Sequence, residues 1–491
     1  MSFPISCAPA VQATFNTGVA LLHSFQYQEA EQTFTQVAQQ DPQCAMAYWG
    51  KAMSLYHQLW DWPSADTLKE GHEDTAQAQK LRAKTDSERM YIVAAGVFFQ
   101  DNAKLSRASR TKAYSDWMGR VFTKYPDDVN AGAFYALSLI TVQGKKADEL
   151  ANREQAIDIL NKLFAIAPNH PGVAHYLIHA TDTPELASQG LVAARRYAKI
   201  APDSSHALHM PSHIFVRLGL WQEAIDSNIA ATAAATKATQ AGQADASYQF
   251  HAMDFLDYAY LQSGQAAKAR GLVDELKNVA GASAEDVADN QANFAARNAF
   301  ELHQWKEAAA LPVPDVKGGW QATTYFARAI GAARTGDAAA AQENLAKYKE
   351  AIAGENDKVY GVSSSATIGQ QEVEAWVDYA EGKNAEAVKA MRAAAAQEAT
   401  EGVDSLSMPA REMLGDMLTE MKRPREALVE YKAALQESPN RFDSLYGAAQ
   451  SAQLSGSAET ARKYYAKLIE MCGNGADRLE LEEARTKLAQ K

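Results

Sequence analysis

The sequence predicts an all-α protein built from repeated pairs of antiparallel helices, and three observations lead to this prediction. A motif of two histidines, His175 and His179, is repeated as His209 and His213. Hydrophobic residues make up 47% of the chain, with only 28 glycines and 15 prolines, which suits packed helices over most of its length. No sustained alternation of apolar and polar residues indicates strands.

The spacing between the two histidine motifs is about 34 residues, which is the period of the tetratricopeptide (TPR) helical hairpin. Small residues in this hairpin let its two helices approach, and a proline ends the second helix because it cannot continue the hydrogen-bond ladder. The first hairpin carries the pattern as Gly18, Ala30, Phe34 and Pro42. A late hairpin carries it as Gly415, Ala427, Tyr431, Ala434 and Pro439.

About twelve hairpins follow one another along the chain and predict a right-handed superhelical solenoid. They are expected at 11–44, 45–83, 86–126, 129–168, from 171, and at 205–238, 250–281, 289–312, 322–352, 370–398, 408–441 and 442–473. Connections are predicted at 60–71 and 144–150, and linkers at 239–247 and 353–369. Three regions of one continuous solenoid result: N-terminal repeats with an aromatic loop at 1–126, His-rich repeats at 127–281 and C-terminal repeats at 282–491.

Charge and composition exclude several functional classes. The net charge of −12 argues against nucleic acid as a partner, because nucleic-acid binding needs a basic face. No apolar run approaches the roughly 18–20 residues that span a bilayer. The chain start has no secretory signal, so we expect a soluble cytoplasmic protein, or a periplasmic one if this is a mature form.

The three cysteines contain no C-x-x-C pair, which excludes a zinc ribbon or a thioredoxin-like site. Cys7 and Cys44 precede the first helices of consecutive repeats. They form a disulfide if the protein is exported, or are two small, semi-buried residues.

The repeated histidines predict a metal site. His175 and His209 take position 5 of their repeats, and His179 and His213 take position 9, both of which face the concave groove of a TPR domain. Residues four apart share one helix face, and packed helix axes lie about 8–10 Å apart. Four imidazoles can therefore meet at one ion, with metal–nitrogen distances of about 2.0–2.1 Å.

Further groove positions join this prediction. His251 is expected to complete the set of metal ligands. Four further residues are expected to support the ligands or to line the groove: Asp182, His206, Asp254 and Tyr258. Nitrogen ligands without cysteine suit Zn²⁺, Cu²⁺, Ni²⁺ or Fe²⁺ and do not suit Ca²⁺ or Mg²⁺. Two alternatives stay open: a metal-free polar groove for an acidic ligand, and plain packing of duplicated residues.

A second set of residues suggests an aromatic ligand shelf near the start of the chain. His23 and His57 are separated by the same repeat period, and Trp49 and Tyr56 project to the same inner wall. The alternative is an aromatic-rich wall that only caps the solenoid.

The segments HPGVAHYLIH at 170–179 and HALHMPSHIF at 206–215 resemble a bacterial group of TPR-repeat proteins. CAMAYWG at 44–50 and SPNRFDSLYG at 438–447 are similar to it as well, so the resemblance covers essentially the whole chain. This resemblance implies a TPR fold. Members of the group are often exported, and the resemblance implies no activity.

These observations predict a TPR binding protein with a His-lined transition-metal site in its concave groove, which takes a protein, peptide or small-molecule ligand. One alternative is a metal-dependent hydrolase or oxidoreductase at the same site. H-E-x-x-H, P-loop and nucleophile-elbow motifs are absent, so catalysis would depend on the metal, with Asp182 or Asp254 as general base. The other alternative is a metal-free interaction scaffold.

Overall fold

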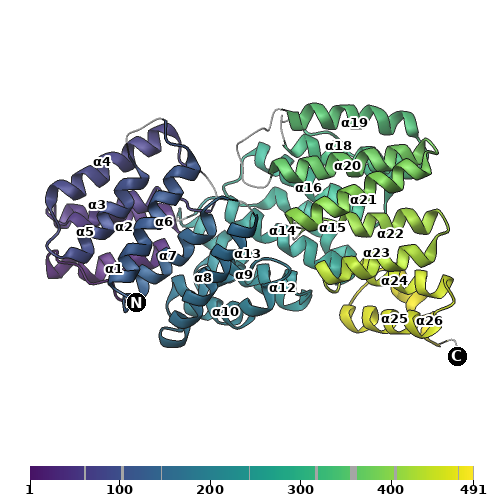
Figure 1. Cartoon of the computed structure of the whole chain (residues 1–491). Coiled ribbons are helices and arrows are strands. Elements are labelled where there is room, and N and C mark those ends of the chain that lie inside the picture. The colour runs from purple at the N-terminus through teal and green to yellow at the C-terminus, as the bar shows by residue number, and fades with distance from the viewer. Residues whose placement is uncertain are drawn as a thin grey trace. The chain divides into compact units, whose positions relative to one another are not determined.

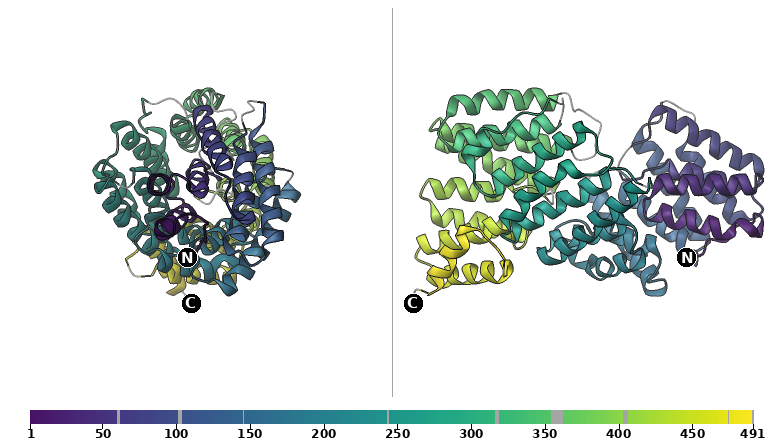
Figure 2. Two further views of the ribbon diagram at one scale, coloured as in Figure 1. Left: turned by 90° about the vertical axis from the view of Figure 1, so that its left-hand side faces the viewer. Right: turned by 180° about the vertical axis from the view of Figure 1, so that it is seen from behind.

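The computed structural model describes residues 1–59, 62–100, 104–144, 146–242, 244–315, 319–353, 362–402, 406–473 and 475–489. Every regular element within these residues is a helix, as Figures 1 and 2 show, so the all-α prediction is confirmed. The chain divides into two compact units, Met1–Asp182 with Leu186–Ile214, and Thr183–Glu185 with Phe215–Lys491. Each unit is described by itself, and the three regions predicted from the sequence remain predictions.

The first unit stacks five consecutive helix pairs. The pairs are α1 (Gln12–His23) with α2 (Tyr27–Gln40), α3 (Ala45–Ser54) with α4 (Ala65–Leu81), α5 (Asp86–Phe98) with α6 (Arg107–Lys124), α7 (Val129–Thr141) with α8 (Lys146–Ile166), and α9 (Pro171–Thr181) with α10 (Ala187–Ile200). The 3-10 helix η1 (Pro9–Val11) precedes them, and α11 (Ser205–His209) and the start of α12 (Pro211–Arg217) follow.

The second unit repeats this architecture. Its first complete helix is α13 (Trp221–Gln240) and its last is α26 (Leu479–Ala489), and it includes the 3-10 helix η2 (Leu276–Asn278). Its helix pairs are α14 (Ser247–Gln262) with α15 (Ala266–Glu275), α16 (Ala284–Glu301) with α17 (Trp305–Ala309), α18 (Gly319–Arg334) with α19 (Ala338–Ala353), α20 (Val362–Ala380) with α21 (Asn384–Glu401), α22 (Ala410–Glu420) with α23 (Pro424–Glu437), and α24 (Phe442–Leu454) with α25 (Ala458–Cys472). These pairs, with α11–α13 between the two series along the chain, match the predicted hairpins. No described helix is long and apolar enough to cross a membrane.

Three predicted connections are shorter than expected. Helix α4 begins inside the predicted 60–71 connection because Ser64 caps it, accepting a 3.1 Å hydrogen bond from the Thr67 N–H. Helix α8 begins at Lys146, inside the predicted 144–150 turn. Of the predicted 353–369 linker, 354–361 lie outside the described residues, and helix α20 begins directly after them.

The repeat pattern works through one packing rule in both units. The ring of Phe34 fills the space between Gly18 of α1 and Gly50 of α3, where any side chain would collide with it. Tyr431 fills the equivalent space between Gly415 and Gly447 in the second unit. Glycine is therefore required at these positions by close approach, which explains why the small-residue positions alternate with an aromatic residue.

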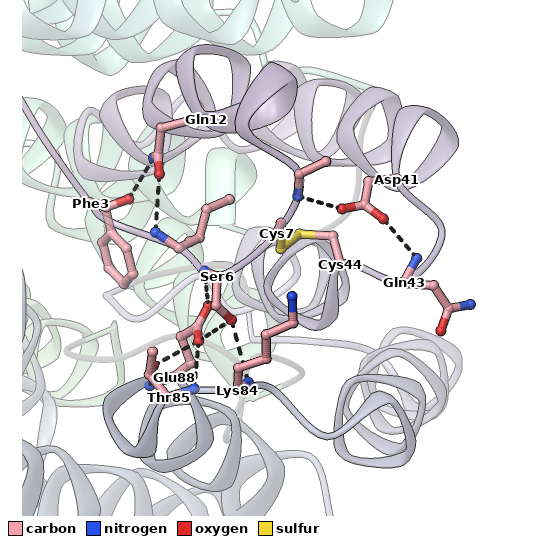
Figure 3. The surroundings of a disulfide bond; sticks show 12 residues. Phe3, Ser6, Cys7, Gln12, Asp41, Gln43, Cys44, Lys84, Thr85 and Glu88 are labelled. Atoms are coloured by element: carbon pink, nitrogen blue, oxygen red, sulfur yellow. Dashed lines mark hydrogen bonds between the residues drawn. A yellow bond between two sulfur atoms is a disulfide. The ribbon is translucent and has the colours of Figure 1, made fainter.

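The N-terminal segment, residues 1–8, is bound to the first repeats (Figure 3). Cys7 and Cys44 form a disulfide, so the first of the two cysteine alternatives holds. The Ser6 N–H and hydroxyl donate to the Glu88 carboxylate at 2.7 and 2.6 Å. The Ala8 N–H donates to Asp41 at 2.8 Å. These bonds fix the segment over the starts of α1, α3 and α5.

A long-range contact within the first unit positions the candidate site. Helix α9 packs on its neighbours α7, α8 and α10, and it also packs on α1 from the first repeat. The turn between α1 and α2 consequently lies against the histidines of α9. This contact joins the first helix pair of the unit to the fifth, which no local pattern in the sequence specifies.

Candidate metal centre

Three histidines of the first unit turn their ring nitrogens toward one another. His175 and His179 lie one helical turn apart on α9, and His206 lies on α11. The Nε2 atoms of His179 and His206 are each 3.0 Å from Nε2 of His175. The ligand atoms of all three residues lie within 4.8 Å of one another, a spacing that suits a metal ion. We call these residues the three-histidine cluster.

The hydrogen bonding of His175 defines its tautomer. Its Nδ1 lies 2.7 Å from the backbone oxygen of His23, and because a carbonyl only accepts, Nδ1 carries the proton. In the neutral ring, Nε2 then carries the one in-plane lone pair. Two other ring nitrogens approach this lone pair at 3.0 Å, and only one of them can donate a well-aligned hydrogen bond to it.

Burial disfavours protonation of His175 and His179. His175 is fully buried and His206 is 6% exposed. Burial, reinforced by the neighbouring His179, holds the pKa of His175 well below its ordinary value. Burial and the nearby rings of His213 and His206 lower the pKa of His179 in the same way. Uncharged imidazoles with converging lone pairs are the protonation state that metal coordination requires.

The second histidine pair lies beside this cluster. His209 and His213 have their Nε2 atoms 3.1 Å apart, and the rings of His213 and His179 have centroids 6.3 Å apart. The Nδ1–H of His213 donates to the Asp182 carboxylate at 2.9 Å. A carboxylate on Nδ1 orients an imidazole so that Nε2 is available to a metal or a substrate.

A buried polar network supports the cluster from behind. The side-chain oxygen of Asn130 lies 3.2 Å from Nε2 of His23 and 3.1 Å from Nε2 of His170, and its amide donates to the Ser2 backbone oxygen at 3.1 Å. His23 in turn provides the carbonyl that holds His175. Burial lowers the pKa of His170 to about 4 and that of His23 well below its ordinary value. The N-terminal segment is thus linked to the cluster through a chain of hydrogen bonds.

Several predicted site residues lie elsewhere than expected. His206 was expected in a supporting role, but it is a member of the three-histidine cluster, because α11 places it directly over α9. Position 5 was expected on an open groove, but His175 is buried beneath the α1–α2 turn and Tyr197, whose ring stacks on it at 5.0 Å. The four repeated histidines divide into two pairs, with His206 joining the first.

The predicted residues of α14 belong to the second unit. Asp254 pairs with Arg297 at 2.7 Å, and the Tyr258 hydroxyl accepts a 2.6 Å hydrogen bond from Arg441. His251 is exposed and packs edge-on against Phe255 with centroids 5.3 Å apart. Its predicted participation in the metal site stays a prediction.

The predicted aromatic shelf is part of the core. Trp49 and Tyr56 are each 1% exposed, and His23 is fully buried. The N-terminal segment and α7 close over Trp49, because burying a large aromatic surface is strongly favourable. His57 stacks on Tyr27 with centroids 4.2 Å apart. The burial of Trp49, Tyr56 and His23 fits the alternative of an aromatic wall that caps the solenoid.

Sequence reasoning missed three residues that touch the site. Phe25 packs against all three clustered rings, and Asn130 holds the network behind them. His170 caps α9 and joins the same network. The cap has a local signal, since His170 precedes a proline at the first helical position. Phe25 and Asn130 have none, because their contacts depend on packing between distant repeats.

Comparisons with known proteins add little to this picture. No family model matches the sequence, and no curated protein matches it. A solved structure of a human IFIT1 dimer with m7Gppp-AAAA is 12% identical over 93% of this chain and 95% of that chain, with a TM-score of 0.39. A tetratricopeptide repeat protein from Parabacteroides merdae is 14% identical over 58% of this chain and 97% of that chain, with a TM-score of 0.32. The TPR-type fold therefore rests on the helix pairs and packing of this chain itself.

Proposed function

We propose that the first unit binds a transition-metal ion through His175, His179 and His206. The observation that carries this proposal is the single lone pair of His175 Nε2, which faces two other ring nitrogens at 3.0 Å. A cation between the rings turns all three nitrogens into favourable ligands at once.

The spacing fits coordination distances. Nitrogen ligands at about 2.0–2.1 Å from one metal lie about 3.3 Å apart in a tetrahedron and about 2.9 Å apart at adjacent octahedral corners. The 3.0 Å separations fall in this range. Imidazole ligands favour Zn²⁺, Cu²⁺, Ni²⁺ or Fe²⁺.

The role that we propose is a binding protein whose metal site takes part in holding a protein, peptide or small-molecule ligand. The net charge of −12 disfavours nucleic acid, which would have to approach against repulsion. A metal-free interaction scaffold is the outcome if the test below finds no metal.

A metal-dependent enzyme is a second candidate, and the number of ligands favours it. Catalytic zinc sites use three protein ligands and leave one position for water or substrate, whereas structural sites use four. His213, oriented by Asp182 at 2.9 Å, lies beside the cluster and is placed to accept a proton. The reaction would be a hydrolysis or an oxidation at the metal.

The test is the metal content of tag-free protein, measured by mass spectrometry after reconstitution with Zn²⁺ or Cu²⁺. We expect one tightly held ion per chain, lost in His175→Ala and in His206→Ala. His72→Ala is the matched control, because this histidine of the first unit lies outside both histidine groups, and it should keep the ion. Full metal content in both cluster variants would refute the site.

The disulfide bears on the location of the protein. Disulfides persist in oxidising compartments, so the Cys7–Cys44 bond supports the periplasmic alternative. Alkylation of thiols in intact cells should then leave these two cysteines unmodified. Labelling of both in freshly lysed cells would instead place the protein in the cytoplasm.

A further inference from the structure

The turn between α1 and α2 carries a phenylalanine where most turns of its kind carry glycine. Its backbone places Phe25 in the left-handed region, with φ of 56°, and bonds the next residue, Gln26, back to the Leu21 oxygen at 3.0 Å. Two described turns of the same form carry the polar residues His303 and Lys422. Glycine takes this position at Gly219, Gly264, Gly336, Gly382 and Gly456.

Glycine is favoured there because a left-handed backbone strains a residue that has a Cβ. A large apolar side chain gains nothing from the turn itself that would offset this strain. The contacts of the Phe25 ring are therefore expected to offset the strain of the left-handed backbone.

The ring of Phe25 lies over the three-histidine cluster. Its centroid is 4.3 Å from that of His175, 5.5 Å from that of His179 and 5.7 Å from that of His206. The side chain is 1% exposed. It thus covers the three rings from the side of the first repeat, with an apolar surface that cannot itself coordinate a metal.

We infer that Phe25 is the residue that shields the metal position and determines which exogenous ligands can reach it. This inference rests on the proposed metal site. An apolar shell around a metal controls the access of solvent and the release of the ion. A flat ring held by a strained turn is a fixed cover, whereas a flexible side chain such as Met would adapt to an incoming ligand.

The repeat architecture supplies an unusually clean test. Phe25→Gly installs the residue that the equivalent turns carry, so the backbone of the turn accepts it. Phe25→Leu keeps an apolar side chain but removes the flat ring. Lys422→Gly is the matched control, because Lys422 has φ of 59° at the same turn position in the second unit.

The probes are Co²⁺ as the bound metal and azide as the small ligand, followed by visible absorption, with the rate of Co²⁺ transfer to a chromogenic chelator as second readout. We expect the wild type and Lys422→Gly to release Co²⁺ slowly and to respond weakly to azide. Phe25→Gly should bind the same amount of Co²⁺, release it about tenfold faster or more, and bind azide with a changed spectrum.

The outcomes separate the two proposals. Normal Co²⁺ binding with unchanged release and unchanged azide response in Phe25→Gly overturns the shielding role and leaves the metal site intact. Absence of Co²⁺ binding in the wild type, together with absence of Zn²⁺ and Cu²⁺ after reconstitution, overturns the metal site itself. If Phe25→Gly does not fold, as judged by circular dichroism, Phe25→Leu decides: faster release supports the role of the ring, and wild-type release contradicts it.

Discussion

Each unit buries a polar cluster with ligand atoms close enough for a metal ion, and the two clusters have opposite chemistry. In the first unit the members are His175, His179 and His206, and in the second they are Glu301, Glu412 and Asp443. Geometry alone does not distinguish them, since both satisfy the same 4.8 Å spacing. What distinguishes them is the charge of their members and whether counter-charges lie beside them.

The acidic cluster contains its own cations. Arg441, fully buried, donates to Glu301 at 2.8 and 2.9 Å and to Glu412 at 2.7 and 3.0 Å. Arg478 donates to Asp443 at 2.8 Å. The two guanidinium groups supply counter-charges that a metal ion would otherwise provide, and the cluster joins helices of the C-terminal repeats as a structural element.

The histidine cluster consists of three imidazole rings. Its members present nitrogens to one another, with burial and mutual repulsion disfavouring protonation. Buried charges that are paired are typical of structural elements, whereas converging neutral imidazoles are the donor set that a metal site requires. Three measurements test this difference between the two clusters.

The largest effect is expected at the acidic cluster. Arg441→Met leaves two buried carboxylates without their cation, and breaking a buried pair costs about 3–5 kcal/mol of unfolding free energy. Urea denaturation measures this loss. Arg392→Ala is the control, because its ion pair with Glu426 is exposed and contributes little. If Arg441→Met were as stable as the wild type, the structural role of the acidic cluster would be wrong.

The second effect is an opposite response of the two units to pH. The pKa of His170 is lowered to about 4 by burial, so its stabilising contribution is present above about 6.5 and is lost as pH falls toward 4. Burial raises the pKa of Asp257 to about 7, so its contribution is present below about 4 and is lost as pH rises through 7.

Lowering the pH from about 7 to about 5.5 should therefore weaken the metal-free first unit and strengthen the second, with His170 and Asp257 each contributing about 1–2 kcal/mol. Thermal unfolding followed by limited proteolysis assigns each transition to its unit. His170→Gln should reduce only the first response and Asp257→Asn only the second. Parallel responses of both units in the wild type would contradict the assignment.

The smallest effect concerns the network behind the histidines. Asn130→Ala removes the side chain that holds His23 and His170, and the carbonyl of His23 orients His175. Loss of such a supporting partner lowers metal affinity about tenfold. Competition with a chelator measures the affinity, with Asn278→Ala, an exposed asparagine of the second unit, as control. Unchanged affinity would mean that the network supports only the fold.

Much of this molecule is readable from local sequence patterns. The repeat period and the small–aromatic alternation specify the helix pairs, because helix packing at one position needs the same residue types in every repeat. The candidate site was only partly predictable. The spacing of four positions puts His175 and His179 together, and His209 and His213 together, but it does not say which pair acquires a third ring.

Local sequence patterns are enough to predict the all-α repeat fold, the pairing of histidines on single helices and the overall acidic charge. Tertiary structure alone decided that His206 completes the cluster, that Phe25 covers it and that Asn130 supports it. These two sets of contacts differ in the distance along the chain between the residues that make them. Helical periodicity acts between residues three or four apart, whereas the contact of α1 with α9 depends on how the intervening repeats stack, which is set by the sum of many small packing terms.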